Sequence, residues 1–334
     1  MADERPLHRQ VRDRLREIVL AQPIGERTAI PPEPDLEEMM AVSRGTVRKA
    51  VDSLVAEGLL VREQGRGTFV EPAAQVRRIV AERLAGVAKP DSRLDDDFQS
   101  FIPDFDGSDR CAETIAALPV YQQARTLFVS RDNNLQPLRQ RALLDGKRLV
   151  VPSHALRTGV RVLEGVPDGL ERFASMLDGV DEFGETVSLS DLGTVGPVAL
   201  AVTGAVAVTP HGAMFGARHD YFRVEMVVLA ATGALAEDAL TVGVVHDCQV
   251  IDRAPEANLE AHVLELVVTP TTVYHCQTTG RARRFVGGVD TLDRSTIDTI
   301  PGLRALLCGT ANVPPAMLRR ASTSAARTND ASAE

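Results

Sequence analysis

The sequence predicts an α/β protein in which a winged helix-turn-helix domain is followed by a doubly wound, mainly parallel α/β domain. In the first 70 residues, three helical segments precede a strand, a glycine-rich turn and a second strand. Beyond residue 75, short apolar runs rich in β-branched residues alternate with helical segments, which is typical of a parallel sheet covered on both faces. The 334 residues also suit two domains of roughly 150 residues each.

Composition excludes several classes of protein. With 44% apolar and 25% charged residues, the chain is globular rather than fibrous or disordered throughout. The longest apolar candidate, 197–210, is shorter than the roughly 18 residues of a membrane span. The N-terminal residues lack the basic start and apolar run of a secretory signal. We therefore expect a cytoplasmic protein with no membrane partner.

Cysteine spacing and net charge exclude further classes of site and partner. The four cysteines are scattered without a C-x-x-C pair, so we interpret them as reduced thiols and expect neither a disulfide framework nor a zinc site. The net charge of −9 argues against a protein coated in positive charge for blanket nucleic-acid binding. It does not exclude a local basic surface.

Each helical segment of the first domain has its apolar residues at helical spacing. The stripe of the first helix is Leu7, Val11, Leu15 and Ile18. The second helix is expected to begin at Pro34 and to bury Leu36, Met39 and Met40. The third follows Ser43, whose hydroxyl can cap a helix N-terminus, and ends at Gly58, a favoured left-handed terminator.

The start of the third helix has the residue types that a DNA major groove requires. Arg44 and Arg48 are four residues apart and therefore share one helix face, from which either can fork onto a guanine edge or hold a phosphate. Gly45 lets the backbone approach a duplex, and Lys49 adds a point charge. The alternative is a solvated arginine face on a dimerisation or protein-binding module.

Three stretches of this domain resemble the GntR family of bacterial transcription regulators: PLHRQVRDRLR from Pro6, VSRGTVRKAV from Val42 and EGLLVREQGRGTFV from Glu57. The resemblance implies double-stranded operator DNA as a partner. The DNA-binding residues that we expect are Ser43, Arg44, Gly45, Thr46, Arg48 and Lys49, with Gly65, Arg66 and Gly67 at the hairpin tip. The family usually starts its second helix with Ser-Glu-Arg, whose arginine touches DNA, whereas this chain has Pro32-Glu33-Pro34. One contact is therefore missing, and Glu33 would repel phosphate.

Strands and helices alternate in the second domain. The expected strands are 126–130, 148–152, 198–202, 240–245 and 266–269, and the expected helices are 110–118, 137–144, 220–232 and 256–265. Six blocks in this region resemble the 5-formyltetrahydrofolate cyclo-ligase superfamily, most closely its methenyltetrahydrofolate synthetase domain-containing branch. The blocks are IPDFD from Ile102, AALPVY from Ala116, PLRQRALLDGKRLVVP from Pro137, GAMFG from Gly212, VHDCQVID from Val245 and VTPT from Val268.

The phosphate loop that this resemblance implies is altered. The family enzyme binds ATP and magnesium with a Gly-Lys-Gly-x-Gly-Tyr turn followed by an aspartate. Gly216, Tyr221 and Glu225 persist here, but Ala217 replaces the lysine, Arg218 and Asp220 replace glycines, and Arg223 replaces the aspartate. We therefore expect a degenerate pocket kept for ligand sensing, with no catalytic residue, metal or cofactor. The alternative is an active ATP-dependent folate enzyme with a DNA-binding head.

A ligand crevice in such a sheet forms beyond the carboxyl ends of the strands. The expected ligand-binding residues are His211, Gly216, Arg218, His219, Tyr221, Glu225, His246, Asp247, Gln249, Thr269 and Thr271. The histidines and Asp247 suit a divalent ion, but their spacing matches no compact metal motif. Cys248 as a nucleophile lacks a supporting pattern. Arg139, Arg141 and Lys147 face either an anionic ligand or solvent.

These inferences predict a DNA-binding domain over 1–72, an α/β domain over 75–280 and an extension over 281–334 that ends in a disordered tail. The hypothesis is a ligand-responsive bacterial transcription regulator, which binds an inverted-repeat operator as a homodimer and senses a folate, nucleotide or carboxylate. An RNA-binding role ranks last, because the chain has no tryptophan and three tyrosines for stacking on bases.

Overall fold

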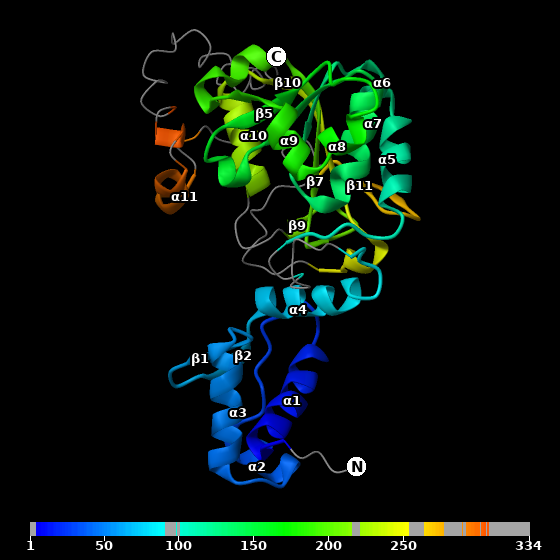
Figure 1. The fold of residues 1–334 in the computed structure, drawn as a ribbon. Coiled ribbons are helices and arrows are strands. Elements are labelled where there is room, and N and C mark those ends of the chain that lie inside the picture. Colours follow the sequence, from blue (N-terminus) through cyan, green and yellow to red (C-terminus); the bar gives the residue numbers. More distant parts are fainter. Residues whose placement is uncertain are drawn as a thin grey trace, which may run out of the picture.

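The computed structural model describes residues 5–90, 98, 101–215, 221–253, 264–276, 289, 292–300, 302–304 and 306. A small N-terminal domain, which we call the head, lies beneath a larger α/β domain, and helix α4 (Pro72–Leu84) crosses between them (Figure 1). No helix within these residues combines the length and apolarity that a bilayer span needs.

The head has the predicted order of elements. Helices α1 (Leu7–Leu20), α2 (Glu33–Met40) and α3 (Arg44–Ala56) precede the antiparallel hairpin of β1 (Leu60–Glu63) and β2 (Gly67–Val70). Leu15, Leu36 and Leu54 are completely buried and join the three helices in one core. Gly58 follows α3 with φ at +75°, the left-handed conformation that glycine adopts without steric cost. The predicted winged helix is confirmed.

One expectation about the head core is wrong. Leu36 is buried and Met40 packs at the edge of the core, but Met39 is 55% exposed. Leu36 and Met40 are four residues apart and face the same way, whereas Met39 lines a surface hollow together with Leu7 of α1. Leu7 at that end is itself 53% exposed, so it does not cover Met39.

The α/β domain is built on a sheet with strand order β12-β11-β10-β7-β3-β4-β5-β6. The central strands β4 (Arg148–Pro152), β3 (Thr126–Val129), β7 (Val198–Gly204), β10 (Leu235–Val244) and β11 (Leu266–Val268) pair in parallel. Antiparallel pairings add β5 (Val160–Leu163) and β6 (Glu185–Val187) at one edge and β12 (Val273–His275) at the other. The mainly parallel sheet was predicted, but the antiparallel edges were not.

Helices cover both faces of this sheet, which makes the domain doubly wound. Along β3, Leu127 and Val129 face one apolar core while Phe128 faces the other. The first core lies under α5 (Ser108–Ala116), α6 (Pro119–Gln123), α7 (Gln136–Leu144), α8 (Glu171–Ala174) and α9 (Leu177–Phe183), and the second under α10 (Tyr221–Ala231).

Shorter elements complete the described chain. They are the 3-10 helices η1 (Asn133–Leu135), η2 (His154–Leu156), η3 (Leu189–Val195) and η4 (Asp247–Gln249), the hairpin of β8 (Ala207–Val208) and β9 (Met214–Phe215), and α11 (Arg294–Thr299). The helices predicted over 110–118, 137–144 and 220–232 correspond to α5, α7 and α10. The helix predicted over 256–265 lies outside the described residues, apart from 264 and 265, and so does the tail predicted at the end of the 281–334 extension.

Candidate DNA interface and ligand crevice

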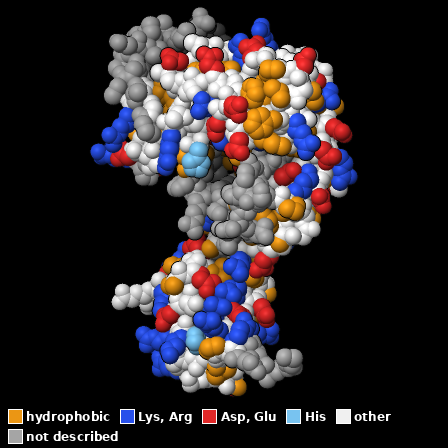
Figure 2. Space-filling model, in the orientation of Figure 1, with side chains coloured by type: hydrophobic (Ala, Val, Ile, Leu, Met, Phe, Trp, Pro, Cys, Tyr) orange, Lys and Arg blue, Asp and Glu red, His pale blue; other side chains and the backbone are white. Residues whose placement is uncertain are grey.

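The predicted DNA-contacting helix lies with its N-terminal turn exposed. The Ser43 hydroxyl accepts a hydrogen bond from the backbone N–H of Thr46 at 3.4 Å, which caps α3 as predicted. Arg44 is 72% exposed, and Arg48 and Lys49 are also exposed. A Cβ added to Gly45 would have no neighbour within 4 Å, so this turn is open to a large partner. Lys and Arg side chains gather on the head in Figure 2, with Asp and Glu among them.

The hairpin tip is equally open. Gly65 and Gly67 have φ of +75° and +123°, and both lie in the region that other residues rarely adopt. Arg66 between them is 74% exposed and lies 2.7 Å from the Glu63 carboxylate, with its guanidinium 5.8 Å from the centre of the Phe69 ring. The tip therefore presents a cation on a narrow backbone turn.

Acidic residues of α2 lie against the exposed arginine of α3. The Glu33 carboxylate is 3.6 Å from Arg44 Nε and 3.7 Å from the Arg62 guanidinium, and Glu37 is 4.0 Å from Arg44 Nε. Glu33 thus partly neutralises the side chain best placed to enter a groove. Because these pairs are long and the Arg44 side chain is exposed, a duplex can replace them at low cost.

Glu33→Gln should raise the affinity of the full-length chain for DNA about 2- to 5-fold, because one negative charge leaves the surface that faces phosphate. Fluorescence anisotropy with a labelled duplex at fixed salt would measure the change. Glu82→Gln is the control: it also removes one negative charge, but on α4 and not beside α3, and should have little effect on DNA affinity. Unchanged or weaker binding by Glu33→Gln would show that this carboxylate does not face DNA.

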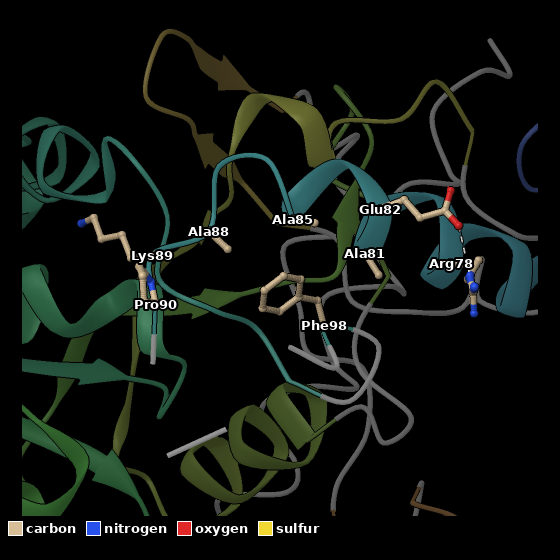
Figure 3. A pocket seen from close by; sticks show the side chains of 8 residues that line it. All are labelled: Arg78, Ala81, Glu82, Ala85, Ala88, Lys89, Pro90 and Phe98. Atoms are coloured by element: carbon tan, nitrogen blue, oxygen red, sulfur yellow. Dashed lines mark hydrogen bonds and ion pairs between the residues drawn. The ribbon is translucent and has the colours of Figure 1, made fainter. Parts of the chain in front are cut away.

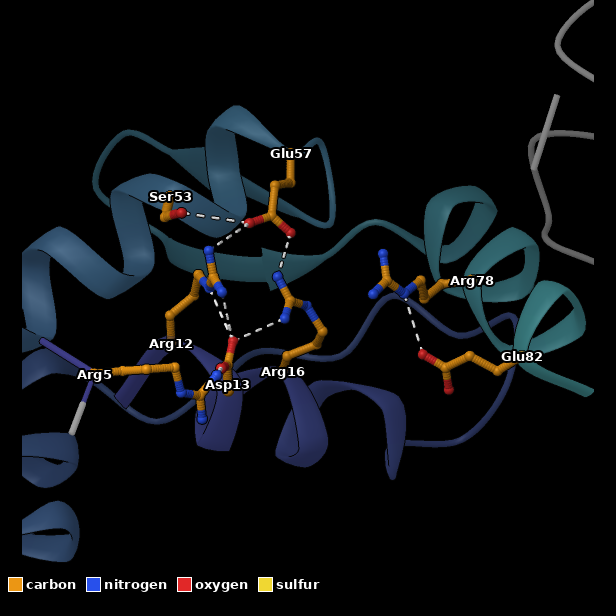
Figure 4. Close-up of polar contacts among 8 residues, drawn as sticks. All are labelled: Arg5, Arg12, Asp13, Arg16, Ser53, Glu57, Arg78 and Glu82. Carbon is orange, nitrogen blue, oxygen red and sulfur yellow. Dashed lines mark hydrogen bonds and ion pairs between the residues drawn. The ribbon is translucent and has the colours of Figure 1, made fainter. Parts of the chain in front are cut away.

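A second cluster of arginines holds α1 against the end of α3 (Figure 4). Asp13 accepts hydrogen bonds from Arg12 at 2.7 Å, Arg16 at 3.0 Å and Arg5 at 2.6 Å. The hydrogen bond from Arg12 lowers the pKa of Asp13. Glu57, just after α3, accepts from Arg16 at 2.7 Å. These arginines on and just before α1 are therefore paired within the head, and Arg16 joins α1 to the end of α3.

Helix α4 is fixed to the head by a buried glutamine. The Gln75 amide donates to the carbonyls of Val19 at 3.1 Å and Gln22 at 3.0 Å, at the end of α1, and accepts from Gly25 N–H at 3.2 Å. Gln75 is fully buried. Its substitution would leave backbone groups unsatisfied, so this residue anchors α4 to the head.

The opposite face of α4 packs on the α/β domain. Val76, Val80 and Leu84 form one apolar cluster, together with Val206, Ala207, Phe215 and Ile251. Arg77 lies over the Phe215 ring at 4.9 Å, and Arg83 donates to the Cys248 carbonyl at 3.3 Å. Phe215 is also the residue directly before Gly216, where the altered phosphate loop begins in the sequence. The domain boundary predicted between residues 72 and 75 thus falls in the first turn of a packed helix.

A hollow of about 510 Å³ lies along the outer face of α4 (Figure 3). Its middle is lined by Ala81, Ala85 and Phe98. Its polar ends are already paired, since Arg78 contacts Glu82 at 3.1 Å and Lys89 contacts Asp104 at 3.0 Å. It therefore offers a ligand small apolar contacts but few convergent polar groups.

Some of the predicted ligand residues meet at the ends of β10 and β11. Asp247 Oδ1 accepts hydrogen bonds from the hydroxyls of Thr269 at 2.5 Å and Thr271 at 2.6 Å. His246 Nδ1 accepts from Cys248 N–H at 3.2 Å, and its backbone N–H donates to Gln249 at 2.7 Å. These side chains bond to one another and hold the turn of η4 together.

Other predicted ligand residues are elsewhere or outside the described chain. Gln249 is buried and donates to the carbonyls of Ala205 at 2.7 Å and Val206 at 3.0 Å, so its amide joins the β7–β8 connection to η4. His211 is exposed in the turn between β8 and β9, and Glu225 is buried on α10, one turn after Tyr221. Gly216, Arg218 and His219 lie outside the described residues. No group of three or more His, Cys, Asp or Glu residues within the described chain is arranged to hold a metal ion.

Two polar residues that the sequence analysis missed lie where the strand order reverses. In the sheet, β3 lies between β4 and β7. The chain passes from β3 to β4 on one side, and β7 pairs with β3 on the other side. A parallel sheet is expected to form a crevice at such a point, here between the ends of β3 and β7. Asp132 accepts from Gly204 N–H at 2.9 Å, and Asn134 donates to the Val244 carbonyl at 2.8 Å. The signal that could have found them is their place directly after the first buried strand.

Asn134 has an acceptor left over. Its side chain is 1% exposed, and its Oδ1 has no hydrogen-bond partner among the described residues. A Cβ added to Gly204 would lie 3.0 Å from both this oxygen and Asp132 Oδ2, so a larger residue at 204 would crowd both groups. Buried polar atoms normally have partners. We therefore treat Asn134, Asp132 and Gly204 as a candidate ligand site and call it the crevice.

The pKa of Asp132 makes the stability of the α/β domain depend on pH. Burial raises this pKa, against the opposing hydrogen bond from Gly204 and the charge of Arg139. The folded protein then holds the proton longer than the unfolded chain, so this contribution is present at acid pH and is lost as pH rises through the folded pKa. Asp132→Asn should flatten that decline in urea denaturation measured at several pH values.

Asp181→Asn is the control, because the stability contribution of Asp181 changes with pH in the opposite direction. The hydrogen bond from Arg131 lowers the pKa of Asp181, so its contribution is present at neutral pH and is lost as pH falls. An Asp132→Asn profile that parallels the wild type would contradict burial of this carboxyl.

The three cations considered as anion ligands all have other partners. Arg139 is 1% exposed and donates to the carbonyls of Ser130, Asp132 and Ser175 at 2.8, 3.0 and 2.9 Å. Arg141 pairs with Asp145 at 2.9 Å, and Lys147 donates to the Ala124 carbonyl at 2.8 Å. The Arg139 side chain therefore faces neither solvent nor ligand, because the η1 and α8 regions present backbone acceptors to it.

Together the fold and these surfaces define a winged-helix DNA-binding domain joined by a packed helix to a doubly wound α/β domain. Residues 7–70 match the model of the bacterial regulatory proteins of the gntR family, and residues 71–270 match that of the 5-formyltetrahydrofolate cyclo-ligase family. The second match spans more than half of the chain. The chain therefore belongs to the 5-formyltetrahydrofolate cyclo-ligase family and has a GntR-type DNA-binding domain at its N-terminus.

Individual relatives match one domain each. The methenyltetrahydrofolate synthase domain-containing protein of Bos taurus is 33% identical over 213 residues, which are 61% of this chain and 54% of the relative. The chain thus spans about half the length of that relative. The mannosyl-D-glycerate transport/metabolism system repressor MngR of Escherichia coli is 40% identical over 67 residues, covering 20% of this chain and 28% of MngR. A solved AraR DNA-binding domain in complex with operator ORR3 is 37% identical, covering 21% of this chain and 88% of that one, with a TM-score of 0.20.

Proposed function

We propose that this protein is a ligand-responsive transcription regulator that binds operator DNA as a homodimer and senses a small molecule in a degenerate cyclo-ligase-like domain. The observation that carries the proposal is the exposed, capped N-terminal turn of α3, with Arg44 and Arg48 on one face, beside a glycine-bounded wing. A recognition helix of this kind reads base edges from its first turns, and the wing reaches backbone or minor groove.

Sensing without turnover is supported by the altered phosphate loop. Ala217 stands where the family lysine would neutralise a triphosphate, and Asp220 brings a negative charge to the same loop. Arg223, in the first turn of α10, replaces the carboxylate that would favour magnesium. These three changes weaken ATP and metal binding without removing the crevice at the ends of β3 and β7.

The crevice favours a ligand with N–H donors. Asn134 Oδ1 and the Asp132 carboxyl both lie against Gly204, and the first of them is a buried acceptor without a partner in the described chain. A pterin ring or a nucleotide base supplies amino and ring N–H groups, whereas a small carboxylate supplies none. We therefore rank folates and nucleotides above carboxylates as effectors.

Helix α4 supplies the connection between crevice and DNA. Its apolar face packs against Phe215, immediately before the loop, while Gln75 on the other side holds the end of α1. A ligand that binds one arrangement of this junction better than another would shift the orientation of the heads, and only that difference in affinity can do so.

A thermal-shift screen of the full-length chain tests the sensor. 5-Formyltetrahydrofolate, ATP and small carboxylates would be compared on wild type and on Gly204→Leu, which fills the crevice. We expect a folate or nucleotide to raise the melting temperature of the wild type alone, because binding to the folded state stabilises it by mass action. Equal shifts in both proteins, or none, would contradict a ligand site at this crevice.

The competing function is an active ATP-dependent folate enzyme, which the family match favours. ATP consumption in the presence of 5-formyltetrahydrofolate separates the two. We expect no turnover above that of Gly204→Leu. Turnover by the wild type that this variant lacks would establish an enzyme and remove the sensor-only account.

A further inference from the structure

An apolar groove between α1 and α2 is open on the head. It has a volume of about 430 Å³ and is lined by Leu7, Val11, Arg14, Ile18, Met39 and Val42, among others. Leu7 and Met39 are more than half exposed although both occur at core spacing in their helices. Exposed apolar side chains that line one groove indicate a surface for a partner.

The two sides of the groove differ in charge. Arg14 lies on the α1 side. On α2, Asp35 and Glu38 are exposed; they precede Met39 by four residues and by one residue. Arg14 is paired with Glu17 at 2.7 Å, but both side chains are about two-thirds exposed, so the pair is weak and can exchange. A surface with a basic half and an acidic half is complementary to itself across a two-fold axis.

The groove lies at the end of the head opposite to the wing. Val42 lines the groove and is two residues before Arg44, the first residue of α3, whereas the β1–β2 hairpin follows the last turn of α3 (Figure 1). On an inverted repeat, two heads that point their wings outward therefore turn their grooves toward the axis between the half-sites.

We propose that the α1–α2 groove binds the same groove on a second copy of the chain when two copies occupy adjacent half-sites. This inference rests on the proposed DNA-binding function. Leu7 and Met39 of each copy become buried across the axis, and the flexible methionine adapts to the opposite surface. Arg14 of one copy meets Asp35 and Glu38 of the other. Because the groove is small, this contact stabilises the pair on DNA without making a tight dimer in solution.

Met39→Asp tests the contact through cooperativity. The probes are a two-half-site duplex, selected from a random-sequence library by the full-length wild type, and the same duplex with one half-site scrambled. We expect Met39→Asp to lower affinity for the two-site duplex at least 10-fold and to leave the single-site affinity unchanged. Leu7→Asp should behave in the same way. Leu144→Asp is the matched control, because Leu144 is 59% exposed on α7, away from the head.

A charge exchange tests the pairing across the axis. Arg14→Glu should weaken two-site binding, and combining it with Asp35→Arg and Glu38→Arg should restore it. Wild-type cooperativity in Met39→Asp, or an equal loss on the single site, would overturn the contact. Non-cooperative binding by the wild type would overturn it while leaving the DNA-binding function intact. Failure of the wild type to select any duplex would overturn both.

Discussion

Arg44→Ala is expected to weaken binding of the full-length chain to its selected duplex about 5- to 150-fold, equivalent to roughly 1–3 kcal/mol. The Arg44 side chain is 72% exposed, and the carboxylates of Glu33 and Glu37 lie 3.6 and 4.0 Å from its Nε. Its guanidinium can therefore turn to DNA and bond a guanine edge with two N–H groups, which a methyl group cannot replace.

Binding to random-sequence DNA distinguishes the two roles of this arginine. If Arg44 reads a base, Arg44→Ala loses affinity for the selected duplex and little for random DNA. An equal loss on both duplexes would mean that the side chain holds phosphate. Arg78→Ala, on α4, removes the same charge outside α3 and serves as the control in anisotropy titrations at fixed salt.

Arg139→Met is expected to lower the free energy of unfolding of the α/β domain by about 3 kcal/mol or more. Arg139 is fully buried and donates to three backbone carbonyls, from Ser130, Asp132 and Ser175. Methionine fills similar space but donates no hydrogen bond, and each buried acceptor left unsatisfied costs about 1–3 kcal/mol.

Urea denaturation followed by circular dichroism measures this loss. Arg141→Met, two residues along α7, removes an exposed arginine paired with Asp145 and should leave the midpoint nearly unchanged. An Arg139→Met midpoint equal to that of Arg141→Met would show that the buried guanidinium contributes little beyond its volume.

The head was predictable because its signals are local. Ser43 as cap, Gly58 as terminator and the Gly65–Gly67 turn each act within a few residues, and all three occur where expected. Exposure of Met39 was not predictable in the same way. The spacing of an apolar residue does not say whether a neighbouring element reaches far enough to cover it.

The crevice and the junction depend on contacts between distant parts of the chain. Asp132 and Asn134 acquire their role from the strand order, which places β7 and β10 beside β3. Helix α4 has its buried apolar residues at 76, 80 and 84, which is a helical spacing. The helix begins with Pro-Ala-Ala, a sequence that is also common in linkers, so the spacing was not recognised. Burial of Arg139 depends on carbonyls presented by η1 and α8, so a charged residue on a helix gave no sign of it.

The most direct test of the account is the affinity of the full-length chain for its selected duplex, measured with and without the compound that raises the melting temperature in the thermal-shift screen. We expect this affinity to change by at least about 5-fold in the wild type and to stay the same in Gly204→Leu. An identical dissociation constant for DNA with the crevice saturated would contradict ligand-responsive DNA binding. The α/β domain would then bind its ligand without changing the affinity of the head for DNA.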